Sequence, residues 1–220
     1  VKKVVRSGAG SALLQTPGRI GEILDAVRPI YKKPLTIKIR SGWDQGSINF
    51  LEIGRIAQEA GVDAITLHPR TRTQGFAGHA NWQHIGELKS ALNIPVFGSG
   101  DIFEADDAIK MLQETGCDGV MIGRGGYGNP WLIRDILRLI QGETICRTER
   151  SETYQVVRQH LQLHMELFGE RKALFEMRKH LCWYAKGLNG SSQFRARLQR
   201  IDTCAELTKL TKDFFLEPAG

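Results

Sequence analysis

The sequence predicts an α/β fold followed by a segment made of helices alone. Short runs rich in β-branched residues recur, centred on Ile37, Ile65, Val96 and Val120 at intervals of 28, 31 and 24 residues. The stretches between them carry apolar residues at helical spacing and end at glycines, as helices commonly do. After about residue 142 only the helical spacing continues. One strand, one crossover helix and two loops fill an interval of this length, so the runs indicate repeated βα units.

The predicted strands cover residues 35–39, 64–67, 94–97 and 119–122. Their runs are apolar on both faces, which is typical of a parallel sheet covered by helices. About four strands are visible, whereas a (β/α)₈ barrel has eight. We therefore expect the C-terminal half of a TIM barrel over residues 1–146 and a small all-helical domain over residues 147–220.

The composition of the 220 residues, 41% hydrophobic and 25% charged, excludes disordered and fibrous classes. The net charge is +6, of which +4 falls from residue 147 onward, and this favours a polyanionic partner such as nucleic acid. No apolar run reaches the roughly 18 residues of a membrane span, so we expect a cytoplasmic protein without a membrane partner. The spacing of the four cysteines predicts neither a disulfide framework nor a metal site.

Two glycine-rich segments follow the last two predicted strands. Gly98-Ser99-Gly100-Asp101 comes after the third and Gly123-Arg124 after the fourth. Asp101 is expected at or near the N-cap of the next helix, where backbone N–H groups can bind an anion. Phosphate sites in βα barrels are often built from consecutive loops of this kind. The pair predicts a site for a phosphorylated cofactor, with simple tight turns as the alternative.

Charged residues occur at the ends of the first two predicted strands. Lys38 interrupts an apolar run, and Arg40 lies two residues on, so both side chains point to the same side. Lys38 is a candidate for holding negative charge on a bound ring or phosphate, and a salt bridge inside the barrel is the alternative. His68 ends the second strand and is followed by Arg70 and Arg72, a cluster suited to phosphate and RNA contacts. A purely structural histidine is the alternative there.

In the predicted helical domain, the basic run Arg178-Lys179-His180 lies close in sequence to Trp183 and Tyr184. Basic residues interleaved with aromatic rings are typical of nucleic-acid binding, but solvated helix faces have similar compositions. Both interpretations stay open from the residues alone.

Several ordered motifs together resemble the tRNA-dihydrouridine synthase family over nearly the whole chain. They begin with the stretch from Lys2 to Leu14 and continue with Lys38-Ile39-Arg40-Ser41-Gly42-Trp43, His68-Pro69-Arg70-Thr71-Arg72, Gly98-Ser99-Gly100-Asp101-Ile102, Met121-Ile122-Gly123-Arg124-Gly125 and Arg178-Lys179-His180. The resemblance implies an FMN-binding TIM barrel joined to a helical domain. It also implies an oxidoreductase that reduces the C5–C6 bond of specific uridines in tRNA, with NADPH as the reductant.

The resemblance further implies roles for individual residues. Lys38 would lie by the flavin ring and His68 beside the flavin and the substrate. The FMN phosphate would be held by Ser99, Gly100, Asp101, Gly123 and Arg124, while Arg70, Arg72, Arg178 and Lys179 would face tRNA. The family's general acid is the cysteine of an Asn-x-x-Cys-Pro segment, which is expected just before Val1. No catalytic residue is therefore assigned within these residues.

Two alternatives remain at this stage. One is an FMN-dependent TIM-barrel oxidoreductase of a small molecule, in which the helical domain is a lid or a dimer contact. The other is a catalytically incomplete fragment that binds RNA without doing chemistry.

Overall fold

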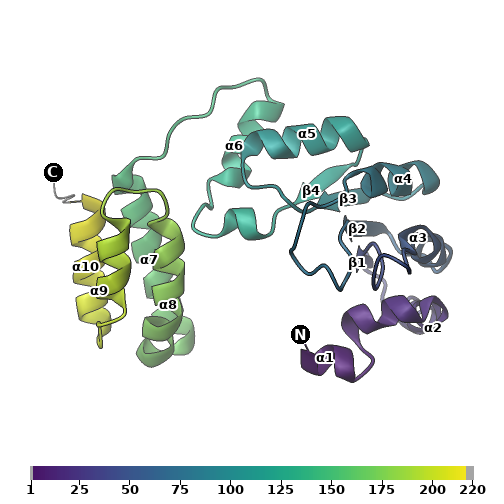
Figure 1. Cartoon of the computed structure of the whole chain (residues 1–220), viewed down its shortest axis with the longest axis horizontal. Coiled ribbons are helices and arrows are strands. Elements are labelled where there is room, and N and C mark those ends of the chain that lie inside the picture. Colours follow the sequence, from purple (N-terminus) through teal and green to yellow (C-terminus); the bar gives the residue numbers. More distant parts are fainter. Residues whose placement is uncertain (1, 217–220) are drawn as a thin grey trace. The chain divides into compact units, whose positions relative to one another are not determined.

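The structure is a computed structural model that describes residues 2–216, and the chain forms two compact units, Val1–Gly125 and Gly126–Gly220 (Figure 1). In the first unit, helices alternate with four strands. Its elements are α1 (Lys2–Arg6), the 3₁₀ helix η1 (Gly10–Gln15), α2 (Pro17–Val27), β1 (Thr36–Arg40), α3 (Phe50–Glu59), β2 (Ala64–His68), α4 (Gln83–Ala91), β3 (Val96–Ser99), α5 (Ala105–Thr115) and β4 (Gly119–Met121).

The short 3₁₀ helix η2 (Arg124–Gly126) follows β4, and the remaining described elements are all helices. They are α6 (Leu132–Ile140), α7 (Arg150–Phe168), α8 (Glu170–Tyr184), α9 (Ser191–Leu198) and α10 (Cys204–Leu216). The structure groups α6 with these helices, whereas the sequence places the domain boundary after residue 146. Where the two domains divide therefore stays a prediction.

The four strands form one parallel sheet in the order β1-β2-β3-β4. Each crossover helix contacts the next, from α2 through α3 and α4 to α5 (Figure 1). Strand order without a reversal is that of a singly wound βα barrel, whereas doubly wound sheets reverse direction at their centre. The predicted fold class, the second half of a TIM barrel followed by helices, is confirmed.

Two details around β3 differ from the prediction. The strand begins at Val96, two residues later than expected, since Pro95 has no N–H to donate to a ladder. Gly98 and Ser99 belong to the strand itself and not to a loop. A Cβ on Gly98 would lie 2.4 Å from Sδ of Met111, so only glycine allows α5 to pack this closely.

The N-cap of the next helix is Glu104 and not Asp101 itself, so of the expected positions it is a near neighbour that caps the helix. Helix α5 begins four residues after Asp101, at Ala105, after a capping box in which Glu104 and Asp107 exchange side-chain and backbone hydrogen bonds. The expected helix stops at Gly61 and Gly116 are confirmed, because Gly116 directly follows α5 and Gly61 lies two residues after the end of α3, with φ near +63° and +78°. The glycine-rich segment after β3 is therefore a loop in its own right.

An aspartate binds the start of the neighbouring strand at two equivalent places. The Asp63 carboxylate, before β2, accepts the Leu35 N–H at 2.6 Å and pairs with Arg28, which directly follows α2. Before β4, the Asp118 carboxylate accepts the Val96 N–H at 2.8 Å and pairs with Lys89 of α4. The first unit thus contains the same aspartate contact twice, and each contact fixes the register of two strands at their N-terminal ends.

The core of the first unit lies between the sheet and its helices. It contains side chains without measurable exposure from α3, β2, α4, β3 and α5, namely Ile53, Ala57, Ile65, Leu67, Ile85, Leu88, Val96, Ala108 and Met111. This apolar layer holds the strands rigidly, so their C-terminal ends can present polar groups in fixed positions.

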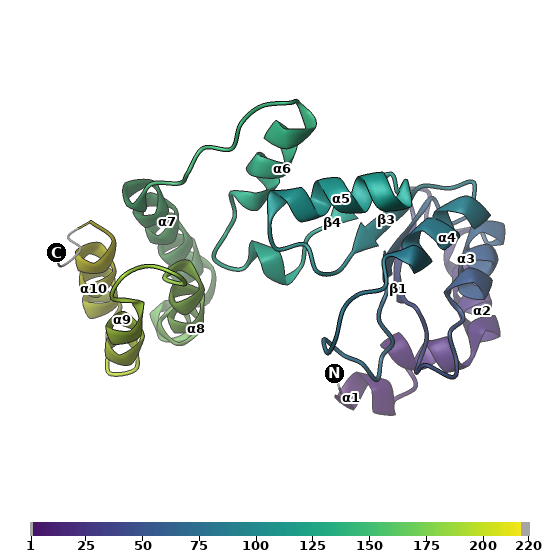
Figure 2. The ribbon, with the colours of Figure 1, turned by 45° about the horizontal axis from the view of Figure 1, so that its top comes forward.

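The helical unit has its own core. Helices α7 and α8 pack against each other, and α9 and α10 pack against them (Figure 2). Its most buried members are Val157, Leu161, Ala173, Met177, Leu181, Ala185, Phe194, Leu198, Leu207 and Phe215. The unit therefore has the separate core that is expected of an independently packed domain.

Candidate functional site

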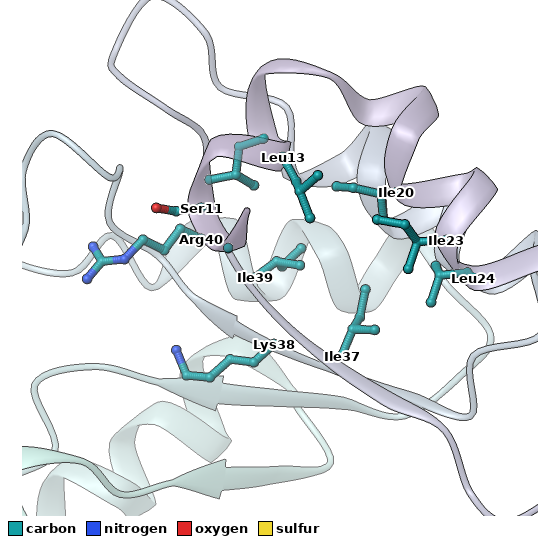
Figure 3. A pocket seen from close by; sticks show the side chains of 11 residues that line it. Ser11, Leu13, Ile20, Ile23, Leu24, Ile37, Lys38, Ile39 and Arg40 are labelled. Atoms are coloured by element: carbon teal, nitrogen blue, oxygen red, sulfur yellow. The ribbon is translucent and has the colours of Figure 1, made fainter. Parts of the chain in front are cut away.

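Side chains of β1 alternate between the two faces of the sheet. Ile37 and Ile39 point toward α2 and η1, whereas Lys38 and Arg40 point away from them (Figure 3). The register places Arg40 beside His68 of β2. The two cationic side chains and the imidazole therefore share the face opposite to α2.

The loops after β2, β3 and β4 leave the sheet at one edge. Leu67 pairs with Gly98, and Ser99 pairs with Met121, so the C-terminal ends of the three strands are level. Active sites of βα barrels lie at this edge of the sheet. Both glycine-rich segments predicted from the sequence therefore lie at the same edge of the sheet as the end of β2.

His68 is buried, with 7% of its surface exposed, and its surroundings are cationic. Burial first, and then the charges of Arg40, Lys38 and Arg70, lower its pKa from 6.5 to about 4. Its Nε2 lies 3.3 Å from Nη1 of Arg70. Because a guanidinium can only donate, Nε2 accepts this bond, and the proton is assigned to Nδ1. The imidazole is therefore neutral at pH 7.

Arg70 is 2% exposed, and its guanidinium faces an anionic partner inside the protein. Nη2 of Arg70 donates to both carboxylate oxygens of Asp101, at 2.8 and 2.7 Å, and to the Gly78 carbonyl oxygen at 2.6 Å. The Asp101 carboxylate also accepts the Ala80 N–H at 2.7 Å. Arg70 therefore ties the loop after β2 to the loop after β3, and its expected contact with tRNA stays a prediction.

The backbone of the loop after β3 passes close to His68. A Cβ on Gly100 would lie 3.0 Å from Cδ2 of His68, and the Gly100 carbonyl oxygen accepts the Trp82 indole N–H at 3.0 Å. Asp101 is the only described non-glycine residue with positive φ, at 57°. This left-handed conformation costs free energy, which its contacts to Arg70 and Ala80 offset.

Arg124 brings the loop after β4 to the same place. Its Nη2 is 3.6 Å from Oδ1 of Asp101, and its guanidinium lies over the Phe76 and Phe103 rings, at 4.3 and 5.5 Å from the centroids. Arg40 is 5.8 Å from the Phe76 centroid on the first strand's side. Phe76 thus stands between two cations at the mouth of the site.

Lys38 and Arg40 lie next to each other on the open side of this cluster. Lys38 is exposed and Arg40 is half-buried. Partial burial and the charge of Arg40 lower the pKa of Lys38. Two neighbouring cations favour an anionic ligand, because its charge would relieve their mutual repulsion.

The remaining predicted tRNA contacts lie in different surroundings. Arg72 is half-buried, with its guanidinium 4.6 Å from the Trp43 ring. In the helical unit Arg178 donates to the Ile201 carbonyl oxygen inside the bundle, whereas Lys179 is exposed beside Trp183. Lys179 is therefore available to a ligand, and Arg178 is engaged within its own unit.

A cavity of about 400 Å³ lies beside β1, and Lys38 and Arg40 are among the residues that line it. Its wall is mainly apolar, and Lys38 and Arg40 turn their side chains away from Ile20 and Ile37 (Figure 3). Within residues 2–216 no group of His, Cys, Asp and Glu side chains has the arrangement of a metal site. None of the helices in that range is long and apolar enough to span a membrane.

Sequence patterns indicate part of this cluster only. Alternation along the strand associates Arg40 with Lys38, and the glycines beside Phe76 mark its loop. No pattern indicates Phe103 or Trp82, because both reach the site through the folding of loops distant in sequence. The partnership of Arg70 with Asp101 likewise has no local signal.

The parallel, singly wound sheet and the cations at its C-terminal edge define a βα-barrel protein with a cationic site at the strand ends. The sequence profile described as dihydrouridine synthase (Dus) matches residues 1–218, so the chain belongs to the dihydrouridine synthase family. The predicted family is confirmed.

Curated relatives agree with this assignment. The chain is 42% identical over 207 residues to the probable tRNA-dihydrouridine synthase 1 of Synechocystis, covering 94% of this chain and 58% of the relative. It is 38% identical over 219 residues to the tRNA-dihydrouridine synthase B of Pseudomonas aeruginosa, covering 98% and 65%. The chain thus spans about three fifths of the length of these relatives.

A mandelate oxidase mutant with bound (S)-mandelic acid matches with a TM-score of 0.39 and 16% identity, over 85% of this chain and 60% of that one. A similarity of this size is too low to support any conclusion about the fold or the function.

Proposed function

We propose that this chain forms the flavin site and the tRNA-binding helices of an FMN-dependent tRNA-dihydrouridine synthase that uses NADPH as its reductant. The observation that carries the proposal is the meeting of Lys38, Arg40, His68 and Arg124 at one edge of the sheet in a member of this family. FMN has an anionic phosphate and gains negative charge on reduction, so it suits a cationic site.

The residues at this edge fit such a cofactor. Arg124 is half-exposed, and a Cβ on Gly123 would have no atom within 4 Å, so there is open space beside the loop after β4. Ser99 ends the neighbouring strand β3, and Gly100 begins the loop that follows it. We assign the phosphate to Arg124 and to the backbone of these two loops, since N–H groups and a guanidinium are its usual partners.

When bound, FMN supplies the hydride chemistry that no side chain can provide. The task of the chain is electrostatic and positional. Lys38 and Arg40 hold negative charge at the ring side of the site, and the charges would be worth a few kcal/mol at an effective dielectric constant of about 20. Neutral His68 can donate from Nδ1 without adding a charge.

The tRNA would be held by residues outside this cluster. Arg72 and Lys179 each place a cation next to an aromatic ring, and such pairs can contact both a phosphate and a nucleotide base. Contacts of this kind make binding fall steeply with salt. Uracil itself would have to leave its stack to reach the site, at a cost of a few kcal/mol.

Flavin fluorescence quenching tests the proposal directly. The 220-residue chain is expected to bind FMN, and Lys38→Ala and Arg124→Ala are each expected to weaken binding at least about tenfold, the loss of one charge-assisted contact. Lys110→Ala and Arg55→Ala, at exposed positions of α5 and α3, are matched controls that leave binding unchanged.

A second measurement concerns the nucleic acid. Unmodified tRNA is expected to bind the chain with an affinity that falls as the salt concentration rises. Lys179→Ala is expected to reduce the slope of log affinity against log salt concentration by about one. Absence of FMN binding would contradict the flavin site. Salt-insensitive tRNA binding would instead favour an enzyme that acts on a small molecule.

A further inference from the structure

Arg70 and Arg124 compete for one carboxylate. Asp101 receives two short hydrogen bonds from the Arg70 guanidinium, at 2.7 and 2.8 Å, while Arg124 stays 3.6 Å away. The side chain of Arg70 is 2% exposed and that of Arg124 is 37% exposed. Arg70 is therefore the permanent partner of Asp101, and Arg124 is held only loosely.

The charges of these three residues leave one cation available. Arg70 and Asp101 neutralise each other inside the protein, so the charge of Arg124 faces the open side of the site. Without Arg70, Asp101 would carry an uncompensated negative charge beside the loop that follows β3. That charge would draw Arg124 toward itself and repel any anion placed next to it.

We propose that Arg70 is a positioning residue, which neutralises Asp101 so that Arg124 is free to bind the phosphate of the cofactor. This inference rests on the proposed function, because it takes the ligand's anionic group to be the FMN phosphate. It gives Arg70 a role at the flavin site in place of a contact with tRNA.

Two further contacts support this role. Arg70 also donates to the carbonyl oxygens of Ala77 and Gly78, at 3.3 and 2.6 Å, and so fixes the loop that carries Phe76 under Arg124. The bidentate contact also holds Asp101 in its left-handed conformation. A lysine would keep the charge of Arg70 but lose the separate Nε and Nη2 donors that reach Ala77 and Asp101 at once.

The test is a double-substitution cycle read by FMN affinity. Arg70→Met removes the charge and keeps much of the apolar stem, and it is expected to weaken FMN binding at least tenfold. Adding Asp101→Asn removes the opposing charge, and asparagine tolerates a left-handed conformation. The double variant is expected to recover most of the lost affinity, to within about threefold of the unaltered chain, whereas Arg55→Met on α3 is the matched control.

Rescue separates positioning from simple support of the fold. If the double variant binds FMN as weakly as Arg70→Met, or if Arg70→Met binds as tightly as the unaltered chain, the inference is overturned. If Arg70→Met does not fold, Asp101→Asn alone decides: tighter FMN binding supports the inference and weaker binding overturns it. Failure of the unaltered chain to bind FMN would overturn the proposed function first, and the inference with it.

Discussion

The low pKa of His68 has a measurable effect on stability. Its pKa is about 4 in the folded chain against an ordinary 6.5, because burial and three neighbouring cations disfavour the charged imidazole. Between these two values the unfolded chain binds a proton that the folded chain does not. The free energy of unfolding therefore rises with pH across this window and is fully restored above pH 6.5.

The size of the effect follows from the two pKa values. The full difference corresponds to about 3 kcal/mol, and about 2 kcal/mol of it is lost between pH 8 and pH 5. His68→Gln removes the titrating group and keeps a polar side chain of similar reach. Between pH 8 and pH 5, the free energy of unfolding of the His68→Gln variant is expected to fall by about 2 kcal/mol less than that of the unaltered chain.

Guanidinium chloride unfolding at the two pH values measures the difference. Carboxylates and other histidines titrate in both proteins, so subtracting one pH dependence from the other isolates His68. His79→Gln, at an exposed loop position, controls for the loss of a histidine as such. Equal pH dependence in the unaltered chain and in His68→Gln would refute the assignment of a buried, neutral imidazole among cations.

Three further substitutions test the packing of the two units. Asp118→Asn is expected to lower the free energy of unfolding by about 1 kcal/mol at pH 7. Contacts to Lys89 and Val96 lower the Asp118 pKa, so the stabilisation by this carboxylate should vanish as pH falls through that lowered pKa. Thermal melts measure the loss against Asp106→Asn, at an exposed position of α5, and equal melting of the two variants would contradict it. Gly98→Ala is expected to lower the free energy of unfolding by about 1–3 kcal/mol, because its Cβ would be forced against Met111. Gly18→Ala, whose Cβ would meet no atom within 4 Å, should not destabilise the chain. Urea unfolding that finds Gly18→Ala less stable than Gly98→Ala would refute the close packing. Burial and then the charges of His180 and His164 lower the His160 pKa, so His160→Gln should reduce the loss of stability of the helical unit between pH 7 and pH 5. Unfolding followed by circular dichroism at the two pH values measures this loss. An equal loss in the variant and in the unaltered chain would count against the prediction.

The alternation of strands and helices was predictable because it depends on local pattern. Parallel strands such as Ala64–His68 are buried along their whole length and mostly apolar, and helices end where Gly61 and Gly116 allow positive φ. Each of these two signals is contained in a stretch of a few neighbouring residues. Their physical cause is local, so the sequence expresses it directly.

The details around β3 were not predictable in the same way. Gly98 resembles a loop glycine in sequence, yet it lies in a strand because Met111 packs against its backbone. Asp101 resembles a helix cap, yet it is held by Arg70, which is 31 residues away in the chain. Tertiary contacts decide both cases, and a local pattern contains no information about them.

For the site, residue types could be predicted but not their partners. Lys38, His68 and Arg124 share one edge of the sheet, as parallel strands require. Arg70 and Arg72 look equivalent in sequence, but one is buried against Asp101 and the other lies over Trp43. Only the three-dimensional arrangement separates the cation that supports the loops from the one available to a ligand.

The comparison of FMN with riboflavin tests the central claim most directly. Riboflavin has the same ring but no phosphate, and both can be titrated into the chain by fluorescence quenching. The charged loop ends after β3 and β4 are expected to make FMN bind at least about 100-fold more tightly, the effect of two charge-assisted contacts. Equal affinity for the two flavins would show that these loops do not hold a phosphate.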